Sequence, residues 1–255
     1  MKKFSVVLAA MVLAATVIAT PALAAIEVTG DAYIGSFSKY VWRGFDLSGG
    51  LPVVQVGADL SAKGFTLSYW TNIQAKNDDI DNDGVIDLNG GEGNETDITL
   101  NYAIPVGEIA TVNVGNIYYT FDGLEDTNEL YVGATLNTLL SPTFKVYYDW
   151  DDNNDNAVDN ENSLFYTASI SHSLPVGDMV TLGASALVSY NDENPSVDVT
   201  YHDWHNYELG AKADIKVMDQ LTITPSITFS SPISDDAKLA IDSQLYGGVN
   251  VLFTF

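Results

Sequence analysis

Apolar residues recur at every second position along most of this 255-residue chain, and no other feature limits the fold as strongly. In one segment Leu130, Val132, Ala134 and Leu136 alternate with Glu129 and its successors. A period of two is typical of a β-strand with one apolar face, whereas an amphipathic helix has a period near 3.6. Twelve segments follow this pattern: 26–38, 51–61, 64–74, 95–104, 109–120, 129–138, 143–150, 163–173, 179–190, 206–217, 221–230 and 243–255.

The connections between these segments alternate between two kinds. One kind is short and comprises residues 62–63, 105–108, 139–142, 175–178 and 218–220. The other is longer, polar and acidic and comprises residues 39–50, 75–94, 121–128, 151–162, 191–205 and 231–242. Alternate connections of an up-and-down sheet lie at opposite ends, and bacterial outer-membrane barrels have tight periplasmic turns and longer outer loops. The sequence therefore predicts an all-β fold, a transmembrane antiparallel up-and-down β-barrel of about 12 strands.

The N-terminus has the features of a secretory signal. Lys2 and Lys3 precede a nearly unbroken apolar stretch at 6–19, and Ala22 and Ala24 supply the small residues that a signal peptidase recognises. We expect residues 1–24 to be a cleaved signal peptide and residues 25–255 to form the barrel.

Composition excludes several kinds of protein. The chain has 34 acidic and 10 basic residues, a formal net charge of −24, no cysteine and one arginine, Arg43. Disulfides and thiolate metal sites are excluded, and nucleic acid is an unsuitable partner because phosphate binding needs a basic face.

The last strand supports a barrel of the outer membrane. Aromatic and aliphatic residues occupy alternate positions back from the terminus, at Phe255, Phe253, Val251 and Val249. A terminal aromatic residue on such a strand resembles the signal by which the barrel assembly machinery of Gram-negative bacteria recognises its clients. The expected location is therefore the outer membrane of a Gram-negative bacterium, and the expected partners are this machinery, membrane lipid and lipopolysaccharide.

A run near the N-terminus resembles a known family. Residues 38–48 read SKYVWRGFDLS, residues 52–57 read PVVQVG, and a strand follows from Gly64 to Trp70. This run resembles the start of the TorF family of porin-like outer-membrane proteins, although Trp42 stands where that pattern has Phe. The resemblance covers about 40 residues, implies a porin-like barrel and brings no catalytic residues with it.

If the apolar face is outside, the polar residues at the intervening positions point into the lumen. Arg43 lies at the mouth of the first hairpin, where two roles are open: joining an acidic loop to the barrel rim, which we favour, or orienting an anionic group. The lumen as a whole is either a narrow pore or one closed by paired charges. The pore-lining candidates are Asp59, Asp97, Glu129, Lys145, Asp149, Glu208, Lys212, Asp214, Lys216 and Arg43.

One acidic loop contains an incomplete calcium motif. Asp79, Asp81, Asp83 and Asp87 occupy relative positions 1, 3, 5 and 9, and a glycine follows at position 6. This spacing is typical of a calcium-binding loop, but position 12 is glycine where a bidentate glutamate belongs. Two interpretations stay open, a weak calcium site and a solvated acidic loop. No other cofactor is expected.

The functional prediction is passive diffusion of small hydrophilic solutes, with a preference for cations because the mouth is negative. The alternative is a barrel without transport that acts in surface binding, adhesion or scaffolding. An enzyme is not expected, because His172 between Ser171 and Ser173 is the only nucleophile and base combination on a predicted strand.

Overall fold

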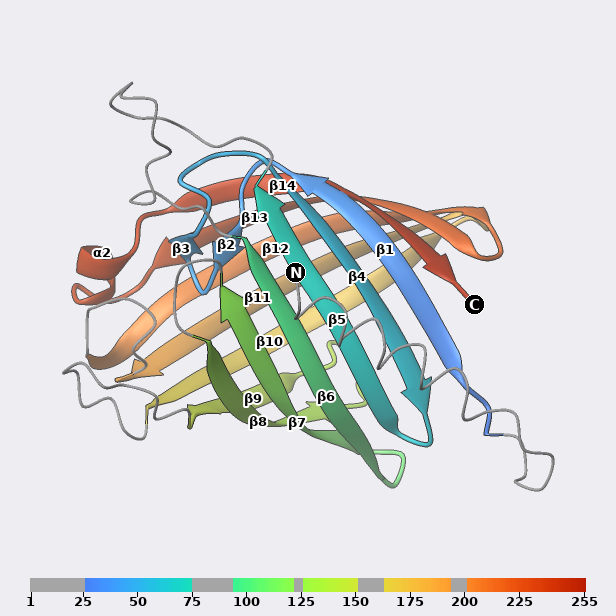
Figure 1. The fold of residues 1–255 in the computed structure, drawn as a ribbon, viewed down its shortest axis with the longest axis horizontal. Helices are drawn as coiled ribbons and strands as arrows, with labels where there is room; N and C mark the ends of the chain where they lie inside the picture. The colour runs from blue at the N-terminus through green and yellow to red at the C-terminus, as the bar shows by residue number, and fades with distance from the viewer. Residues whose placement is uncertain (1–25, 75–93, 122–125, 151–162, 194–200) are drawn as a thin grey trace, which may run out of the picture.

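Twelve antiparallel strands close into one barrel in the computed structural model, which describes residues 26–74, 94–121, 126–150, 163–193 and 201–255 (Figure 1). Each strand pairs with its neighbours in the sequence, and β1 closes the barrel against β14. This confirms the predicted fold class. The barrel strands are β1 (Thr29–Phe37), β4 (Val53–Ala62), β5 (Phe65–Gln74), β6 (Glu95–Val106), β7 (Ala110–Phe121), β8 (Thr127–Leu136), β9 (Thr143–Asp149), β10 (Leu164–Val176), β11 (Val180–Asp192), β12 (His202–Met218), β13 (Leu221–Pro232) and β14 (Gln244–Thr254).

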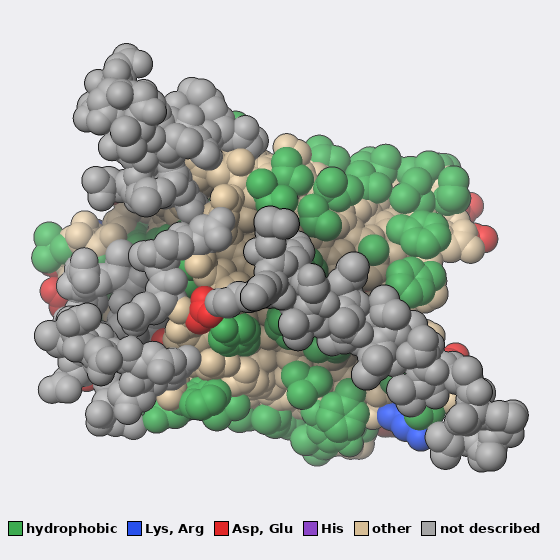
Figure 2. Space-filling view, viewed as in Figure 1, with side chains coloured by type: hydrophobic (Ala, Val, Ile, Leu, Met, Phe, Trp, Pro, Cys, Tyr) green, Lys and Arg blue, Asp and Glu red, His purple; other side chains and the backbone are tan. Residues whose placement is uncertain are grey.

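The alternating apolar residues lie on the outside of the barrel. Val132 is 53% exposed and Leu245 is 62% exposed, and Figure 2 shows hydrophobic side chains spread over the outer surface of the strands. Monomeric soluble proteins rarely expose so continuous an apolar surface. Among the described residues, no helix is long and apolar enough to cross a membrane.

The two kinds of connection lie at opposite ends of the barrel. At one end, called the turn end here, β4 and β5 meet through a two-residue turn in which Lys63 and Gly64 have φ of 52° and 86°. Positive φ at both positions is typical of a type I′ turn, which matches the twist of the paired strands. The longer connections lie at the other end, called the loop end here, as predicted.

β12 begins earlier than the sequence pattern indicates. Residues 202–205 were expected in a loop, but they pair with β11 as far as His202 and Asp192. A register shift between Val188 and Tyr190 inserts an extra residue in β12, and His205 and Asn206 are consequently both buried. A β-bulge of this kind redirects side chains and interrupts the period of two.

A second, two-stranded sheet was not predicted. Within the connection at 39–50, β2 (Val41–Trp42) pairs with β3 (Phe45–Asp46), and Arg43 and Gly44 form the turn with φ of 48° and 84°. We call residues 40–47 the lumen hairpin, since its side chains contact strands on several sides of the barrel. A short helix, α2 (Ala237–Ala240), precedes Ile241, whose Cδ1 lies 2.6 Å from where a Cβ on Gly44 would stand. The φ of Gly44 favours glycine, and a Cβ there would also displace the end of the Ile241 side chain.

Candidate functional site

The side chain at the tip of the lumen hairpin forms a buried ion pair with the barrel wall. Arg43 Nη1 and Nη2 donate to the two carboxylate oxygens of Glu129 on β8, each at 2.8 Å. The side chains of Arg43 and Glu129 are only 8% and 3% exposed. Tyr119 on β7 donates its hydroxyl to the same carboxylate at 2.8 Å. A bidentate pair of this kind fixes orientation as well as charge.

Three aromatic rings surround the Arg43 guanidinium. Its Cζ atom lies 4.3 Å from the ring centroid of Trp42, 4.9 Å from that of Tyr147 and 4.2 Å from that of Phe165. Each ring offers a cation–π contact, and such contacts are stronger when the cation is shielded from water. Burial acts to lower the pKa of Arg43, but the Glu129 carboxylate outweighs burial and holds the pKa above its usual value. The guanidinium thus stays charged inside the barrel.

The backbone of the hairpin tip is bonded to the opposite wall. His205 on β12 donates from Nε2 to the carbonyl oxygen of Arg43 at 2.6 Å, while the Tyr201 hydroxyl donates to His205 Nδ1. The rings of Phe45 and Phe165 lie 5.5 Å from the His205 ring. These contacts, together with the Glu129 pair, hold the tip from two sides and explain how Arg43 maintains a positive φ.

The base of the hairpin has a second ion pair. Lys39 Nζ lies 3.1 Å from Asp46 Oδ2 and donates to Gln244 on β14 at 2.7 Å. The Ser48 backbone N–H and hydroxyl also donate to Asp46. Burial acts to raise the pKa of Asp46, but hydrogen bonds from Gly50, Lys39 and Ser48 outweigh it, so the pKa lies below its usual value.

The lumen differs between the two ends of the barrel. At the loop end the polar residues around the hairpin are buried, among them Asn72, Glu95, Glu129, His205 and Asn206. Toward the turn end, the lumen-facing side chains of Lys212 and Lys216 are 49% and 52% exposed. The hairpin therefore fills part of the lumen toward the loop end, while the two lysine side chains toward the turn end are accessible to water.

Charges in the lumen are unevenly distributed. One wall, formed by β1, β4 and β6, contains Asp31, Asp59, Glu95 and Asp97, and the first two face each other across paired strands. Lys145 on β9 and Lys212 on β12 lie on the other side of the barrel, as the strand order requires. Like charges directly opposite on neighbouring strands are unfavourable, so nearby cations are expected to stabilise the acidic wall.

Nine sequence-predicted candidates lie on barrel strands at positions that alternate with outward apolar residues, and so they face the lumen. They do not form one cluster. Lys212 pairs with Asp214 at 2.9 Å, Lys216 pairs with Asp219 at 2.9 Å, and Lys145 lies 5.6 Å from the Tyr131 ring. The remaining strand candidates are placed separately: Asp149 beside Thr127, Glu208 beside Asn206, Asp97 near Glu95, Asp59 opposite Asp31, and Glu129 at Arg43.

The calcium prediction falls on residues that the structure does not describe. Asp79, Asp81, Asp83 and Asp87 lie outside the described residues, and the calcium site stays a prediction. In the described ranges, no group of three or more His, Asp or Glu side chains has an arrangement that could hold a metal ion.

Several residues of the site were missed by sequence reasoning. Tyr40, Trp42 and Phe45 were assigned to an outer loop, yet Tyr40 is buried and its ring lies 5.4 Å from that of Trp70. A signal was present, because an aromatic run is unusual in a solvated loop and an Arg–Gly pair is compatible with a tight turn.

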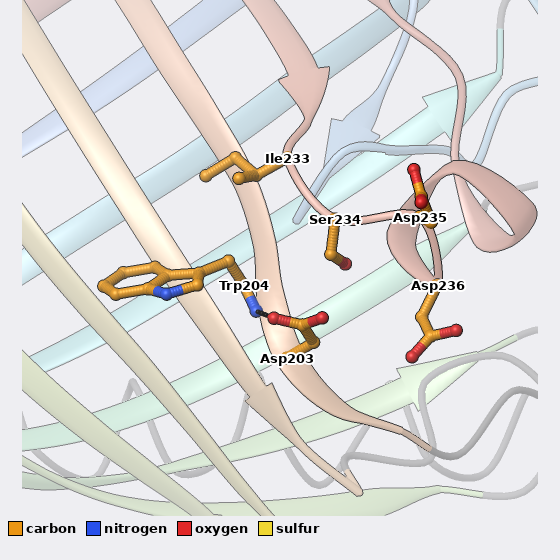
Figure 3. A pocket seen from close by; sticks show the side chains of 6 residues that line it. All are labelled: Asp203, Trp204, Ile233, Ser234, Asp235 and Asp236. Carbon is orange, nitrogen blue, oxygen red and sulfur yellow. Dashed lines mark hydrogen bonds between the residues drawn. The ribbon is translucent and has the colours of Figure 1, made fainter.

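An acidic pocket opens at the rim of the loop end (Figure 3). Asp203 and Trp204 line it from β12, and Ile233, Ser234, Asp235 and Asp236 line it from the connection after β13. Asp235 pairs with Lys238 at 2.8 Å, and Ser234 accepts a hydrogen bond from the Ala237 backbone N–H. These contacts lie within the connection that leads to Ile241, whose side chain approaches Gly44 of the hairpin.

Comparison with known proteins gives a family match and matches to solved barrels. The family model described as "Bacterial protein of unknown function (Gcw_chp)" matches residues 21–224. No curated protein matches the chain. The TorF resemblance is not confirmed by these matches and stays a prediction.

Three solved barrels share the architecture. A NanC porin structure has a TM-score of 0.57 at 12% identity, covering 88% of this chain and 98% of its own. A KdgM porin in complex with disordered oligogalacturonate has a TM-score of 0.51 at 11% identity, covering 89% and 99%. An outer-membrane channel from Pseudomonas putida F1 has a TM-score of 0.51 at 10% identity, covering 91% and 97%. At such low identity the likeness establishes the fold alone.

Proposed function

This chain belongs to the Gcw_chp family of bacterial proteins of unknown function, and we propose that it is an outer-membrane channel for the passive diffusion of small hydrophilic solutes. The observation that carries the proposal is the inverted polarity of the barrel. Apolar side chains such as Val132 face outward, while Lys212 and Lys216 occupy the alternate, lumen-facing positions and are about half exposed to water. A polar, wet interior inside an apolar exterior is typical of barrels that conduct solutes.

The exterior supports a place in the outer membrane of a Gram-negative bacterium. In hydrocarbon every backbone N–H and C=O needs an internal partner, and a sheet without edges meets this need. The pairing of β1 with β14 leaves no open edge in this barrel. Lipid and lipopolysaccharide are then the partners of the outer surface, and the assembly machinery that recognises terminal aromatic strands is the partner during insertion.

We further propose a preference for cations. Asp31 and Asp59 have no ion-pair partner among the described residues, whereas Lys212 and Lys216 are each paired with an aspartate. Negative potential in a narrow, low-dielectric passage concentrates cations. The oligogalacturonate bound by the KdgM porin is a polyanion, and the acidic wall of this chain disfavours a solute of that charge.

The lumen hairpin favours the second candidate, a barrel without transport that acts in surface binding, adhesion or scaffolding. It fills part of the lumen toward the loop end, and its tip is bonded to Glu129 and His205. A channel function therefore requires either a narrow path beside the hairpin or displacement of the hairpin.

Planar-bilayer recording distinguishes the two candidates. We expect the purified barrel to give small, discrete current steps with a cation-selective reversal potential in a salt gradient. A matched variant in which residues 40–47 are replaced by a flexible glycine-serine loop should give larger steps. If both proteins are folded and neither conducts, the channel proposal is wrong and the surface-binding candidate replaces it.

A further inference from the structure

The partners of Arg43 divide into a part that belongs to the hairpin and a part that belongs to the wall. Trp42 is on the hairpin beside Arg43, whereas the carboxylate and the two other rings come from Glu129, Tyr147 and Phe165. These residues lie on β8, β9 and β10, three consecutive strands of the closed sheet. The wall part therefore persists when the hairpin is displaced.

The wall part is organised for a cation. Glu129 is 2% exposed, and the hydroxyl of Tyr119 donates to its Oε2 atom at 2.8 Å, which orients the carboxylate. A buried carboxylate that loses its cationic partner is strongly unfavourable. Once Arg43 has left, Glu129 needs another positive charge in the same place.

The geometry selects one kind of cation. Both Glu129 oxygens accept from one guanidinium at equal distances of 2.8 Å, and aromatic rings lie 4.2 Å and 4.9 Å from its carbon atom. A planar, weakly hydrated guanidinium matches a bidentate carboxylate and stacks on rings, whereas an ammonium is a compact and strongly hydrated point charge. A metal ion would gain little from the ring faces.

We propose that Glu129, Tyr119, Tyr147 and Phe165 form a guanidinium-binding site in the lumen, which the chain's own Arg43 fills as a tethered ligand while the hairpin is docked. A small solute that carries a guanidinium group takes the place of Arg43 when the hairpin is displaced. The binding site stands on the contacts around Arg43. Its use by a passing solute rests on the proposed channel function and names the class of solute that the channel admits.

Chemical rescue of Arg43→Ala tests the site without any measurement of transport. The variant leaves the wall site empty, and ethylguanidinium at millimolar concentration should refill it. At ten times its Kd, a ligand that binds only the folded protein is expected to raise the Tm by about 3 to 6 °C. Ethylammonium should raise the Tm less, and neutral ethylurea should leave it unchanged.

The control is the double variant Arg43→Ala, Glu129→Gln, which keeps the cavity but removes the carboxylate. Ethylguanidinium should no longer stabilise it. If Arg43→Ala does not fold, Arg43→Met, which keeps an apolar stem on the hairpin, is used with the same ligands. Equal stabilisation by ethylguanidinium, ethylammonium and ethylurea, or none by any of them, overturns the site.

Bilayer recording of Arg43→Ala then separates this proposal from the channel function. We expect ethylguanidinium to interrupt the current of Arg43→Ala at concentrations where ethylurea has no effect. If ethylguanidinium stabilises a barrel that never conducts, the binding site stands and the channel function fails. If the barrel conducts and ethylguanidinium neither stabilises nor blocks it, the site fails and the channel function stands.

Discussion

Replacing Glu129 with glutamine is expected to release the lumen hairpin. The change removes the carboxylate that accepts from both Nη atoms of Arg43 and leaves a guanidinium that is 8% exposed without its counter-charge. Breaking a buried ion pair by removing one partner costs about 3 to 5 kcal/mol. The rings of Trp42, Tyr147 and Phe165 still hold the guanidinium in this variant, so the lower end of that range applies. A cost of about 3 kcal/mol increases the population of displaced hairpin about 100-fold.

Proteolysis with an arginine-specific protease measures this population directly. Arg43 is the only arginine of the chain, so the enzyme has one bond to cleave, between Arg43 and Gly44. While the hairpin is docked, this bond lies inside the barrel. If docking is faster than cleavage, the cleavage rate is therefore proportional to the fraction of molecules with a displaced hairpin. We expect the cleavage rate of Glu129→Gln in detergent to exceed that of the wild type about 100-fold.

The matched control is Glu108→Gln, which makes the same chemical change at an exposed position of the turn end. Its cleavage rate should equal that of the wild type. The reasoning is refuted if Glu129→Gln is cleaved no faster than the control while both barrels remain folded, because the ion pair then contributes nothing to docking.

Three further predictions concern the lumen wall, the hairpin turn and acid. Asp31→Asn combined with Asp59→Asn should move the reversal potential in a KCl gradient toward zero, whereas Asp178→Asn, at an exposed position of the turn end, should not. An unchanged potential contradicts the role of the acidic wall. Gly44→Ala places a Cβ on a residue with φ of 84°, 2.6 Å from Ile241 Cδ1. The resulting strain of about 1 to 2 kcal/mol should speed arginine-specific cleavage about tenfold. The control Gly107→Ala, which lies outside the hairpin in open space at φ 58°, should not change the cleavage rate. The pKa of Asp46 is lowered in the folded chain, so its contribution to docking is complete above its ordinary pKa near 3.8 and is lost as pH falls through the lowered pKa. Conductance should therefore rise in strong acid, and less steeply in Asp46→Asn; an equal pH dependence in both proteins contradicts this.

The barrel could be predicted from the sequence because the alternation of apolar and polar residues is visible within each strand. Successive side chains of a strand point to opposite faces, so Leu130 and Val132 point outward while Glu129 and Tyr131 point inward. A few residues of sequence are enough to show this alternation. Strand ends were less predictable. β12 pairs as far as His202, although its apolar alternation begins at residue 206, since backbone pairing continues past a bulge that breaks the period.

The site was only partly predictable, because it depends on contacts between distant residues. Arg43 and Glu129 are separated by 86 positions, and nothing local to either residue specifies the other. The sequence left two roles open for Arg43, joining an acidic loop to the barrel rim or orienting an anionic group; in the structure its partner is instead Glu129 on a barrel strand. The aromatic run around Arg43 indicated burial, and its assignment to a solvated loop was wrong.

Most basic side chains among the described residues are already paired with a carboxylate. Among the described residues, Lys39, Arg43, Lys212, Lys216 and Lys238 each form an ion pair with a nearby carboxylate. Asp31 and Asp59 of the acidic wall have no such partner in the described part of the chain. A docked Arg43 pairs with Glu129 near the loop end, and on the proposed channel function cations are expected to gather beside Asp31 and Asp59. Displacing the hairpin is then expected to expose the Glu129 carboxylate to the same lumen, and a solute with a guanidinium group gains most from reaching it.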